Sequence, residues 1–398
     1  MHILAAIVSA GLSSLALQAT GPVELDLGDG TALRFTTPAP LLWDGPALPD
    51  PVFDAQGSAE VSGLQLKRTV EKVDGGSRVK LAVTNRRSKP IELKSLVPVK
   101  VDGQAGLQVA GTGIGAWTVF RLARHKNDVP GPFRPTRSDA ASQEAANKSG
   151  HRFPSDPGFV IMADDQPAST HLFIGFDGQT EHLSDVSLLL DDKLTTLESM
   201  TASASFDGAV VPPGKTRETH DLYLQTGKGR EGLLADHVER IKARHGGRSA
   251  KHRNVFCTWY FYGSEITAED VRTDLREMKR RPVSFDTFLI DYNWDDYFGD
   301  WETDPQRFPQ GMKAMAAEIR AAGLVPGLWS APFLIDPRSK LFKANPGIVV
   351  KDRAGKPLVF GWEGEKYIVD PTTPQGEALL AQIAKKFVSW GYRYLKFD

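Results

Sequence analysis

Carboxylates, a lysine and several tryptophans lie at the ends of apolar segments in the C-terminal third of the chain. They fall within Ile290–Trp294, Gly299–Trp301, Gly327–Trp329 and Lys396–Asp398. A tryptophan face can stack on the apolar side of a pyranose ring, and carboxylates accept hydrogen bonds from its hydroxyl groups. A carboxylate can also attack an anomeric carbon when a second, protonated carboxyl group assists the leaving group. These residue types therefore indicate chemistry on a carbohydrate.

Each of these residues also has a purely structural interpretation. A single Asp after a strand is commonly a turn former or a helix cap, and Lys396 alone fits an exposed strand position. Any one of Trp294, Trp301 and Trp329 is more often a core residue than a ligand contact. Because independent caps and core residues need not all fall at the ends of successive strands, the combination favours one common site.

The elements around these residues alternate between strand and helix. Strands are predicted at 254–260, 285–291, 324–330 and 392–398. Intervening helices are marked by a Thr267/Asp270 capping box, by Gly323, and by Thr373–Pro374 with Gly391. The order predicts a parallel sheet, and the carboxyl ends of such strands meet on one face. A (β/α)₈ TIM barrel takes about 250 residues, so only its first half would be present; a complete, open doubly wound sheet is the alternative.

The preceding part of the chain has the pattern of a β-sandwich over residues 21–230. Apolar and polar side chains alternate in Arg78–Thr84, and turns rich in Gly and Pro separate such runs. Residues 121–158 show no period and are predicted to form a long surface loop. A linker helix is predicted within residues 231–248, and the barrel domain over residues 249–398. The apolar face of that helix is expected to carry Leu234, Val238 and Ile241.

Composition narrows the functional classes. The 398 residues include 48 basic and 49 acidic side chains, which argues against a nucleic-acid partner. The single cysteine, Cys257, excludes an intramolecular disulfide and is interpreted as a small apolar strand residue. No histidine pair has metal-ligand spacing, so neither a metal nor another cofactor is expected. Residues 1–19 form an apolar run with Ala16 and Ala19 near its end and are interpreted as a signal peptide. We therefore expect a secreted or periplasmic protein, with a cytoplasmic one as the alternative and no membrane partner.

Four segments resemble the first four barrel strands of the α-galactosidases of glycoside hydrolase family 36, in clan D. These are FCTWYFYGSEIT, LIDYNWDDYFGDW, RFPQGMKAMAAEIRAAGLVPGLW and GYRYLKFD. The last resembles the K-x-D motif of that family, which implies that Asp398 is the catalytic nucleophile and that Lys396 contacts sugar hydroxyls. The resemblance also implies substrate-binding roles for Asp291, Trp294, Trp301 and Trp329. It implies an N-terminal β-sandwich before the barrel as well.

The sequence departs from the family pattern next to these residues. Tyr292 and Asn293 replace the second Asp and the Gly of the D-D-G-W motif, although Tyr292 is still expected to border the sugar. Ser330–Phe333 replaces an acidic segment. The acid/base carboxylate of the family lies on a later strand without a counterpart here. The 398 residues are therefore interpreted as a truncated fragment that is inactive by itself.

The resulting hypothesis is a retaining glycoside hydrolase that cleaves terminal α-galactosides through a covalent glycosyl-enzyme. Its expected partners are α-galactoside oligosaccharides or glycoconjugates, and homo-oligomerisation is left open. The alternatives are a related α-glycosidase, a transglycosylase resembling raffinose synthase, and a non-catalytic carbohydrate-binding protein.

Overall fold

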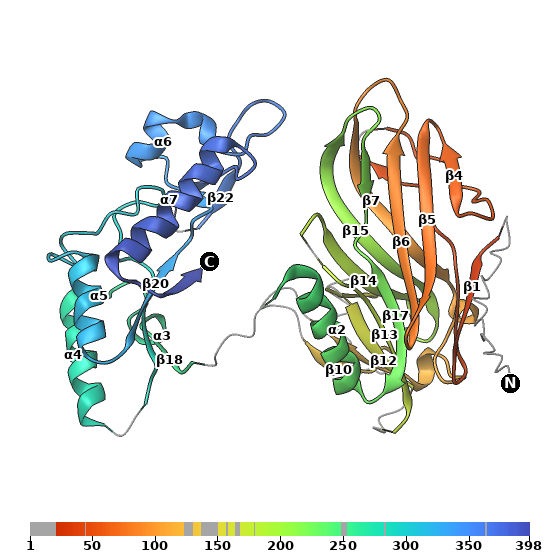
Figure 1. Ribbon diagram of the computed structural model, residues 1–398, viewed down its shortest axis with the longest axis horizontal. Helices are drawn as coiled ribbons and strands as arrows, with labels where there is room; N and C mark the ends of the chain where they lie inside the picture. Colours follow the sequence, from red (N-terminus) through yellow and green to blue (C-terminus); the bar gives the residue numbers. More distant parts are fainter. Residues whose placement is uncertain are drawn as a thin grey trace, which may run out of the picture. The chain divides into compact units, whose positions relative to one another are not determined.

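The chain divides into two compact units, residues 1–248 and residues 249–398 (Figure 1). A computed structural model describes residues 21–43, 45–122, 130–136, 150–156, 158–163, 168–178, 180–247, 253–281, 284–362 and 364–398. The segment predicted to be a signal peptide lies outside the described residues. Each unit is described by itself below.

The first unit is built almost entirely from antiparallel strands. Its largest sheet has nine strands: β10 (Gly131–Phe133), β9 (Thr118–Arg121), β12 (Gly158–Met162), β13 (Thr170–Phe176), β17 (Leu222–Lys228), β6 (Gly76–Asn85), β5 (Leu64–Val73) and β4 (Ser58–Val61) in spatial order, with β16 (Thr216–Glu218) also on β6. The second sheet contains β11 (Arg152–Ser155), β14 (Leu183–Leu190), β15 (Leu197–Val211), β7 (Ile91–Asp102) and β3 (Leu41–Leu42). A third, small sheet contains β1 (Val23–Gly28), β2 (Thr31–Phe35) and β8 (Leu107–Gln108). Two 3₁₀ turns lie at Gln104–Gly106 and Ile114–Ala116.

The alternation predicted for β6 is confirmed. Val79, Leu81 and Val83 of this strand are fully buried, whereas the even-numbered residues between them are partly exposed. Leu81 and Val83 pack in one apolar cluster with Leu93 of β7. Because burying a Val or Leu side chain stabilises a fold by roughly 1.5–3 kcal/mol, this inner face holds the two large sheets together.

Two predictions for the first unit were wrong in detail. The segment 121–158, predicted to be a loop, contributes β10 and β11, although residues 123–129 and 137–149 lie outside the described part. Helix α2 (Arg230–His245) buries Leu233 and His237. Of the predicted apolar face, Leu234 packs partly buried beside Leu233, whereas Val238 is 58% exposed. The face of α2 that carries Leu233 and His237 therefore packs on the sheet. His237 contacts the ring of Phe173 on β13, with 4.7 Å between the ring centroids.

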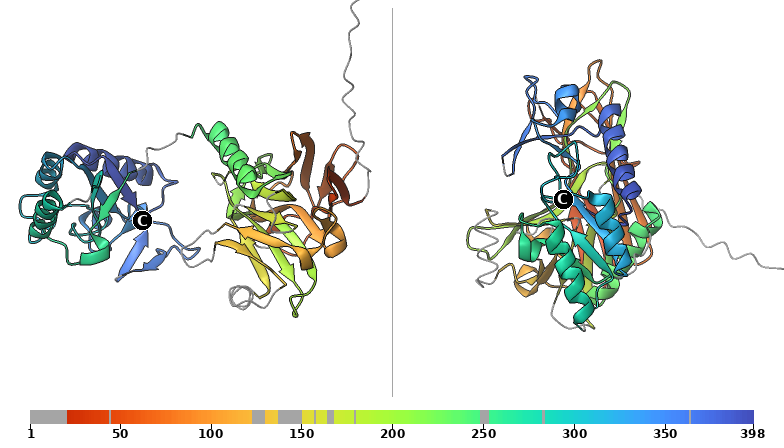
Figure 2. Two further views of the ribbon diagram at one scale, coloured as in Figure 1. Left: turned by 90° about the horizontal axis from the view of Figure 1, so that it is seen from below. Right: turned by 90° about the vertical axis from the view of Figure 1, so that its left-hand side faces the viewer.

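The second unit alternates strands and helices. In chain order it contains β18 (Val255–Cys257), α3 (Trp259–Tyr262), α4 (Ala268–Arg280), β19 (Thr287–Ile290), α5 (Met312–Ala321), β20 (Val325–Ser330), β21 (Leu334–Ile335), α6 (Lys340–Ala344), a 3₁₀ turn (Pro346–Ile348), β22 (Val359–Gly361), β23 (Glu365–Ile368), α7 (Pro374–Trp390) and β24 (Tyr394–Phe397). The right-hand view of Figure 2 shows α4, α5 and α7 in succession beside the sheet. Helix α5 packs against both β20 and α7.

The capping signals in this unit are confirmed. Thr267 and Asp270 form a reciprocal capping box at the start of α4, where each side chain accepts the backbone N–H of the other. Thr373 Oγ1 accepts the N–H of Gly376 at 3.1 Å, and Gly391 ends α7 in the left-handed conformation at φ 105°. These ends fix where each helix returns the chain to the next strand.

The four strands β18, β19, β20 and β24 form a parallel sheet in that spatial order. A doubly wound sheet reverses its strand order at a switch point, and these strands show no reversal among the described residues. The sheet is open at β18 and β24 in the described part of the chain, so the first half of a (β/α)₈ barrel stays a prediction. A smaller antiparallel sheet of β21, β23 and β22 lies in the same unit.

The first of these strands is shorter than predicted. Instead of continuing to residue 260, β18 ends at Cys257, and α3 follows as one helical turn. Thr258 donates its backbone N–H to Leu289 of β19, but its carbonyl accepts the N–H of Tyr262. The chain leaves the sheet because this carbonyl is used in the helical turn.

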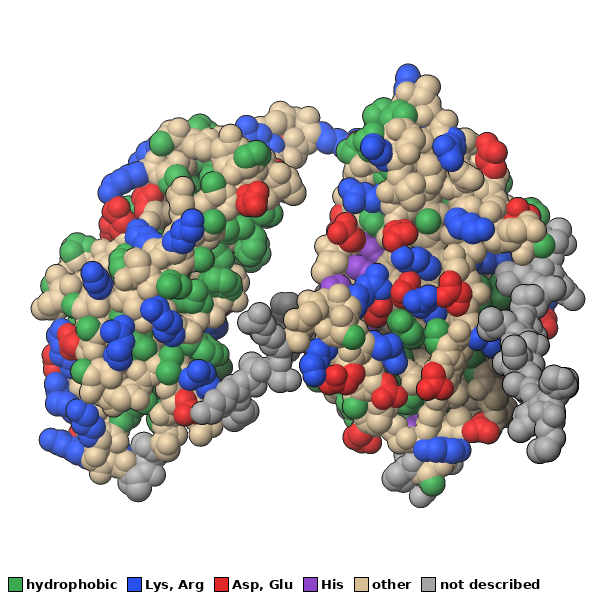
Figure 3. Space-filling model, in the orientation of Figure 1, with side chains coloured by type: hydrophobic (Ala, Val, Ile, Leu, Met, Phe, Trp, Pro, Cys, Tyr) green, Lys and Arg blue, Asp and Glu red, His purple; other side chains and the backbone are tan. Residues whose placement is uncertain are grey.

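The surface agrees with the balanced composition. On the face shown in Figure 3, acidic and basic side chains are interspersed over the first unit. Within the part of the chain that the structure describes, every helix is too short or too polar to span a membrane.

Candidate active site

The ends of the parallel strands bring the predicted polar residues to one edge of the sheet. Asp291 follows β19 directly, and Asp398 follows β24. Trp329 of β20 is in register with Lys396 of β24. The backbone N–H of Asp398 donates to the carbonyl of Ser330 at 2.9 Å, which continues the ladder to the final residue. These contacts place the two carboxylates at the same edge of the sheet, on strands β19 and β24, which are separated by β20.

Asp291 is a buried carboxylate with each oxygen engaged. It is 2% exposed, and its Oδ2 accepts hydrogen bonds from Lys396 Nζ at 2.9 Å and from the Cys257 thiol at 3.2 Å. Its Oδ1 accepts the N–H of Tyr292 at 3.0 Å. Its own backbone N–H donates to Thr258 Oγ1 at 2.9 Å. The carboxylate is therefore held in one orientation before any ligand arrives.

The electrostatics keep Lys396 charged and Cys257 neutral. Burial alone lowers the pKa of Lys396, but the hydrogen bond and charge of Asp291 outweigh it and raise that pKa above its ordinary value. Burial is also the main cause that raises the pKa of Cys257 to about 11, and the neighbouring Asp291 carboxylate adds to it. The thiol therefore acts here as a donor to Asp291 rather than as a nucleophile.

Asp398 is exposed but has one fixed partner. Its Oδ2 accepts the indole N–H of Trp329 at 3.0 Å. Trp329 is 1% exposed, and its backbone carbonyl accepts the indole N–H of Trp294 at 2.9 Å. The rigid tryptophan pair thus orients a carboxylate that keeps a solvent-facing side. Such an oriented carboxylate suits nucleophilic attack on a sugar.

Two of the predicted substrate-binding tryptophans offer no surface for stacking in the described chain. Trp294 and Trp301 are both 0% exposed. Trp301 stacks on Phe298 with 5.1 Å between ring centroids, and Trp294 packs edge-on against Phe387 of α7. The interpretation of these two residues as core side chains therefore describes them better than sugar stacking does.

Tyr292 joins an aromatic group beside the strand ends. Its half-buried ring lies 5.2 Å from Trp329 and 5.4 Å from Trp362, measured between centroids. Trp362 follows β22 and belongs to the turn before β23. Where the resemblance led to an expected second carboxylate, the chain therefore presents aromatic surface, which interacts with carbon-bound hydrogens rather than hydroxyl groups.

Asn293 explains how the chain tolerates the loss of the motif glycine. Its φ is 74°, in the left-handed region that glycine adopts freely and asparagine adopts more readily than most residues. Its side-chain amide donates to the carbonyl of Ser264 at 2.8 Å and fixes the turn. The turn geometry after β19 is therefore kept without glycine.

Three contributors were not predicted as functional from the sequence: Cys257, Thr258 and Trp362. Cys257 was interpreted as an apolar strand residue, but its thiol contacts Asp291. The available signal was its place at the end of the first parallel strand, where active-site residues gather. Trp362 lies in a turn with no periodic pattern, so the sequence gave no signal for its contact with Tyr292.

The described residues contain no group of three or more His, Cys, Asp or Glu side chains arranged to hold a metal ion. The site is built instead from two carboxylates, an ammonium group and indole N–H donors. Groups of these types can donate to and accept from the hydroxyl groups of a neutral ligand.

Residues 254–398 match the family model for the glycosyl hydrolases family 31 TIM-barrel domain. This match covers the second unit and thus all of the site residues described above. The matched model describes family 31, whereas the sequence motifs resemble those of family 36.

Individual sequence relatives are α-galactosidases. The chain is 30% identical over 174 residues to α-galactosidase Mel36A of Lactobacillus acidophilus, a match that covers 42% of this chain and 22% of that protein. It is 35% identical over 71 residues to an α-galactosidase of Escherichia coli, over 16% of this chain and 10% of that protein. These matches therefore span less than a quarter of each relative.

The fold is similar to solved α-galactosidases. TtGalA of Thermus thermophilus, solved with p-nitrophenyl α-D-galactopyranoside, aligns with a TM-score of 0.53 and 23% identity, over 84% of this chain and 61% of that one. The family 36 α-galactosidase AgaA of Geobacillus stearothermophilus aligns with a TM-score of 0.58 and 15% identity, over 98% of this chain and 56% of that one. A strand-rich N-terminal domain is therefore shared with proteins that are longer than this chain.

Proposed function

We propose that these residues belong to a retaining α-galactosidase of the family 36 type, in clan D, with Asp398 as its nucleophile. The observation that carries the proposal is that the Trp329 indole fixes Asp398 at the end of β24, the strand whose Lys396 reaches across β20 to Asp291. The sequence relatives and the similarity of fold support the same reaction class.

In the proposed reaction, a carboxylate oxygen of Asp398 attacks the anomeric carbon as the bond to the leaving group breaks. This forms a covalent glycosyl-enzyme, which water then hydrolyses at the same carbon. Two inversions leave the anomeric configuration unchanged. The Trp329 indole N–H holds one oxygen of Asp398, so that the other is directed toward the sugar.

Asp291 and Lys396 are proposed to bind the sugar hydroxyls. The two lone-pair-rich oxygens of Asp291 accept hydroxyl hydrogens, while the ammonium group of Lys396 donates to hydroxyl oxygens. Because the two side chains already contact each other at 2.9 Å, little side-chain entropy remains to be lost when the sugar binds. The half-buried ring of Tyr292 supplies the apolar side of the same site, and the buried Trp329 packs against that ring.

The leaving group needs a proton donor, which we propose is a carboxylic acid encoded beyond Asp398. Retaining enzymes place the two carboxyl groups about 5–5.5 Å apart. The 398 residues cover 61% of TtGalA and 56% of AgaA, which leaves room in such an enzyme for further strands. On this proposal the sequence is a truncated part of the working protein.

The test is Asp398→Asn in the full-length protein, assayed on p-nitrophenyl α-galactoside, α-glucoside and α-N-acetylgalactosaminide. We expect α-galactoside turnover by the parent enzyme and a loss of at least about 10³-fold in the variant. Added azide should restore turnover of the activated substrate by replacing the missing nucleophile, with an inverted β-galactosyl azide as product.

The matched control is Asp296→Asn, which changes an exposed carboxylate of the same unit and should leave turnover unchanged. Near-normal activity of the Asp398 variant would refute the assignment of the nucleophile. An inverted product from the parent enzyme would refute the retaining mechanism.

A related α-glycosidase is the second candidate, favoured by Tyr292. The aromatic side chain stands where the resemblance leads to an expected carboxylate, and its ring contacts Trp329 and Trp362. A sugar with fewer hydroxyl contacts at that position would fit better. Faster hydrolysis of another α-glycoside in the same substrate panel would favour this candidate over the α-galactosidase.

Export is a further proposal, based on the apolar run at residues 1–19. The mass of the protein recovered from the periplasm or medium would reveal cleavage after Ala16 or Ala19. Recovery of the uncleaved protein in the cytoplasm alone would contradict export.

A further inference from the structure

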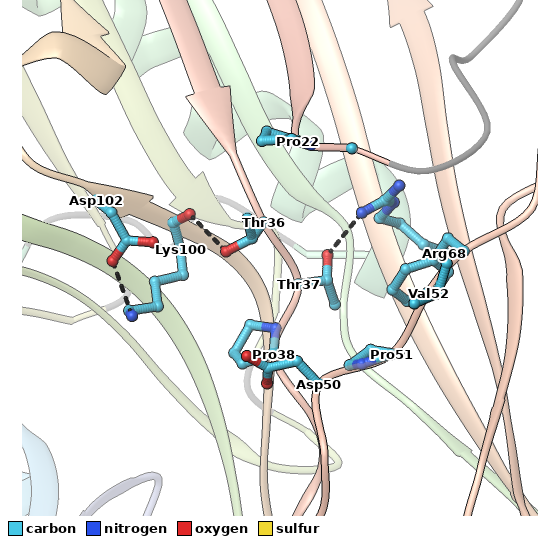
Figure 4. A pocket seen from close by; sticks show the side chains of 12 residues that line it. Pro22, Thr36, Thr37, Pro38, Asp50, Pro51, Val52, Arg68, Lys100 and Asp102 are labelled. Atoms are coloured by element: carbon cyan, nitrogen blue, oxygen red, sulfur yellow. Dashed lines mark hydrogen bonds and ion pairs between the residues drawn. The ribbon is translucent and has the colours of Figure 1, made fainter.

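The strand-rich unit contains a cavity of about 300 Å³ that is lined only by residues of that unit (Figure 4). Its described lining consists of Gly21, Pro22, Thr36, Thr37, Pro38, Asp50, Pro51, Val52, Phe53, Arg68, Lys100 and Asp102. Arg68, Thr37 and Phe53 are at most 6% exposed, whereas Val52 is 70% exposed. The cavity therefore has a buried end at Arg68 and an open rim at Val52.

Arg68 lies on the inner face of the sandwich. Arg68 lies two residues after Leu66 on β5, so the alternation along the strand turns both side chains inward. Its guanidinium carbon lies 4.2 Å from the centroid of the Phe53 ring. Stacking against this ring fixes the plane of the guanidinium and leaves its edge toward the cavity.

Among the residues that the structure describes, the buried charge of Arg68 has no carboxylate partner. Within the same residues its side chain makes one hydrogen bond, from Nη1 to Thr37 Oγ1 at 3.3 Å, and its Nε is buried without a partner. Burial lowers the pKa of Arg68 to about 10, the direction expected for a cation withdrawn from water without compensation. An uncompensated buried charge is costly to a fold, and a bound anion would offset that cost.

The other charges around the cavity limit what the anion can be. Lys100 is paired with Asp102 at 2.8 Å, so that pair adds no net charge. Asp50 adds a negative charge at the exposed rim, where its Oδ1 accepts the N–H of Ala39 at 3.2 Å. One unpaired cation therefore faces one rim carboxylate. The single negative charge of a monoanion is therefore sufficient to neutralise Arg68.

The neutral part of the lining indicates a ligand with a carbon skeleton. Pro22, Pro38, Pro51 and Val52 give the cavity apolar walls (Figure 4). A volume of about 300 Å³ is larger than a single inorganic ion needs and lies at the lower end of small-ligand sites. The rim carboxylate of Asp50 can accept hydrogen bonds from hydroxyl groups.

We propose that this cavity binds a small hydroxylated monocarboxylate, of the sugar-acid class, with its carboxylate on Arg68. The carboxylate replaces the missing counter-ion at the buried end, and the hydroxyl groups face Asp50 at the rim. The site is independent of the strand-end site in the second unit, so its failure would leave the proposed glycosidase function untouched.

The test is calorimetric titration of the full chain with D-glucuronate at constant ionic strength, with D-glucose and sulfate as matched probes. We expect one glucuronate per chain, and at least about tenfold weaker binding of the neutral sugar and of sulfate. Arg68→Met should weaken glucuronate binding at least about tenfold, whereas Arg34→Met, at an exposed arginine of the same unit, should not.

Val52→Trp is a second variant, which obstructs the rim at an exposed position and should fold even where Arg68→Met does not. It should also abolish glucuronate binding. The proposal is overturned if glucuronate does not bind, if glucose or sulfate binds as tightly, or if Val52→Trp leaves binding unchanged. Persistence of binding in a folded Arg68→Met variant would overturn it as well.

Discussion

Lys396 Nζ lies 2.9 Å from Asp291 Oδ2, across two strand ends that are 105 residues apart in the chain. Strand β20 separates the two strands in the sheet. The ion pair therefore spans β20 and connects the second strand to the fourth. This contact joins residues from well-separated βα units, so it depends on the sheet being assembled.

Replacing Lys396 by Met should destabilise the second unit by about 1–3 kcal/mol. The substitution leaves Asp291, only 2% exposed, without its cation, although the partial exposure of Lys396 limits the loss. Urea unfolding would measure the difference, with Lys385→Met as an exposed control on α7. The double variant with Asp291→Asn should recover part of the stability. Equal stability of the Lys396 variant and the parent would contradict a structural role of the pair.

Replacing Trp329 by Phe should lower kcat of the full-length enzyme by on the order of tenfold or more. The phenyl ring fills most of the indole volume but cannot donate to Asp398, whose Oδ2 accepts the indole N–H at 3.0 Å. The control is Trp390→Phe, at a ring that packs on Trp294 at 6.0 Å. If both variants lose the same activity, packing rather than the hydrogen bond orients Asp398.

The thiol of Cys257 should react slowly with alkylating reagents at pH 8. Its pKa is raised to about 11, chiefly by burial, so only a small fraction is thiolate at that pH. Iodoacetamide labelling followed by mass spectrometry should therefore be ~100-fold slower than in the urea-unfolded chain, because only the thiolate is the nucleophile. The difference should shrink as the pH approaches 11. Fast labelling of the folded protein at pH 8 would contradict the buried, neutral thiol.

Acid should destabilise the strand-rich unit through His182. The ring is 6% exposed, and its Nε2 accepts the backbone N–H of His220 at 2.8 Å, a bond that protonation would break. Burial, with a smaller contribution from His220, lowers the pKa of His182 to about 4, whereas the unfolded value is about 6.5. Between these values the unfolded chain binds more protons than the folded one. The stabilisation is therefore complete above about pH 6.5 and is lost progressively as the pH falls towards 4.

Urea unfolding at pH 7.5 and pH 4.5 would measure this dependence. His182→Gln should remove on the order of 1 kcal/mol of the difference between the two pH values, since glutamine does not titrate. The control is His151→Gln, at a partly exposed histidine that contacts Asp192. An unchanged pH dependence in the His182 variant would show that other groups cause the acid sensitivity.

The strand ends could be predicted from the sequence because a parallel sheet brings them together whatever the loops do. The contacts of Asp291 with Lys396 and of Asp398 with Ser330 follow from that arrangement. Helix limits marked by Thr267 and Thr373 were also predictable, since caps are local hydrogen-bonding patterns.

Side-chain direction in the loop after β19 was not predictable. Asn293 and Trp301 have positive φ values of 74° and 50°. Turns of this kind cannot be predicted from the spacing of apolar residues in the sequence. These turns bury the indoles of Trp294 and Trp301, which the sequence resemblance had assigned to the sugar.

The burial of Arg68 in the first unit could have been predicted from the sequence. The alternation in Leu64–Arg68 places Arg68 on the inner face of the strand, where a charged residue is unusual and therefore informative.

The substitution Asp295→Asn should stabilise the second unit at pH 8 and change little at pH 4. Asp295 is 5% exposed, and its Oδ1 has no hydrogen-bond partner in the part of the chain that the structure describes. Burial raises its pKa to about 7 despite the opposing charge of Lys366. The folded protein holds this proton up to about pH 7, whereas the unfolded chain releases it near 3.9. Stability from this group is therefore complete below about pH 4 and falls as the pH rises towards 7.

Asparagine resembles the protonated acid in shape and carries no charge at any pH. Asp295→Asn should therefore raise the free energy of unfolding at pH 8 by on the order of 1 kcal/mol, as measured by urea unfolding. Asp296→Asn removes an exposed neighbouring charge that contributes to the raised pKa of Asp295, and it should give a smaller gain. A loss of stability at pH 8 in the Asp295 variant would mean that the charged carboxylate, through Lys366, favours the fold. In that case the pKa of Asp295 in the folded protein would lie below its unfolded value of about 3.9.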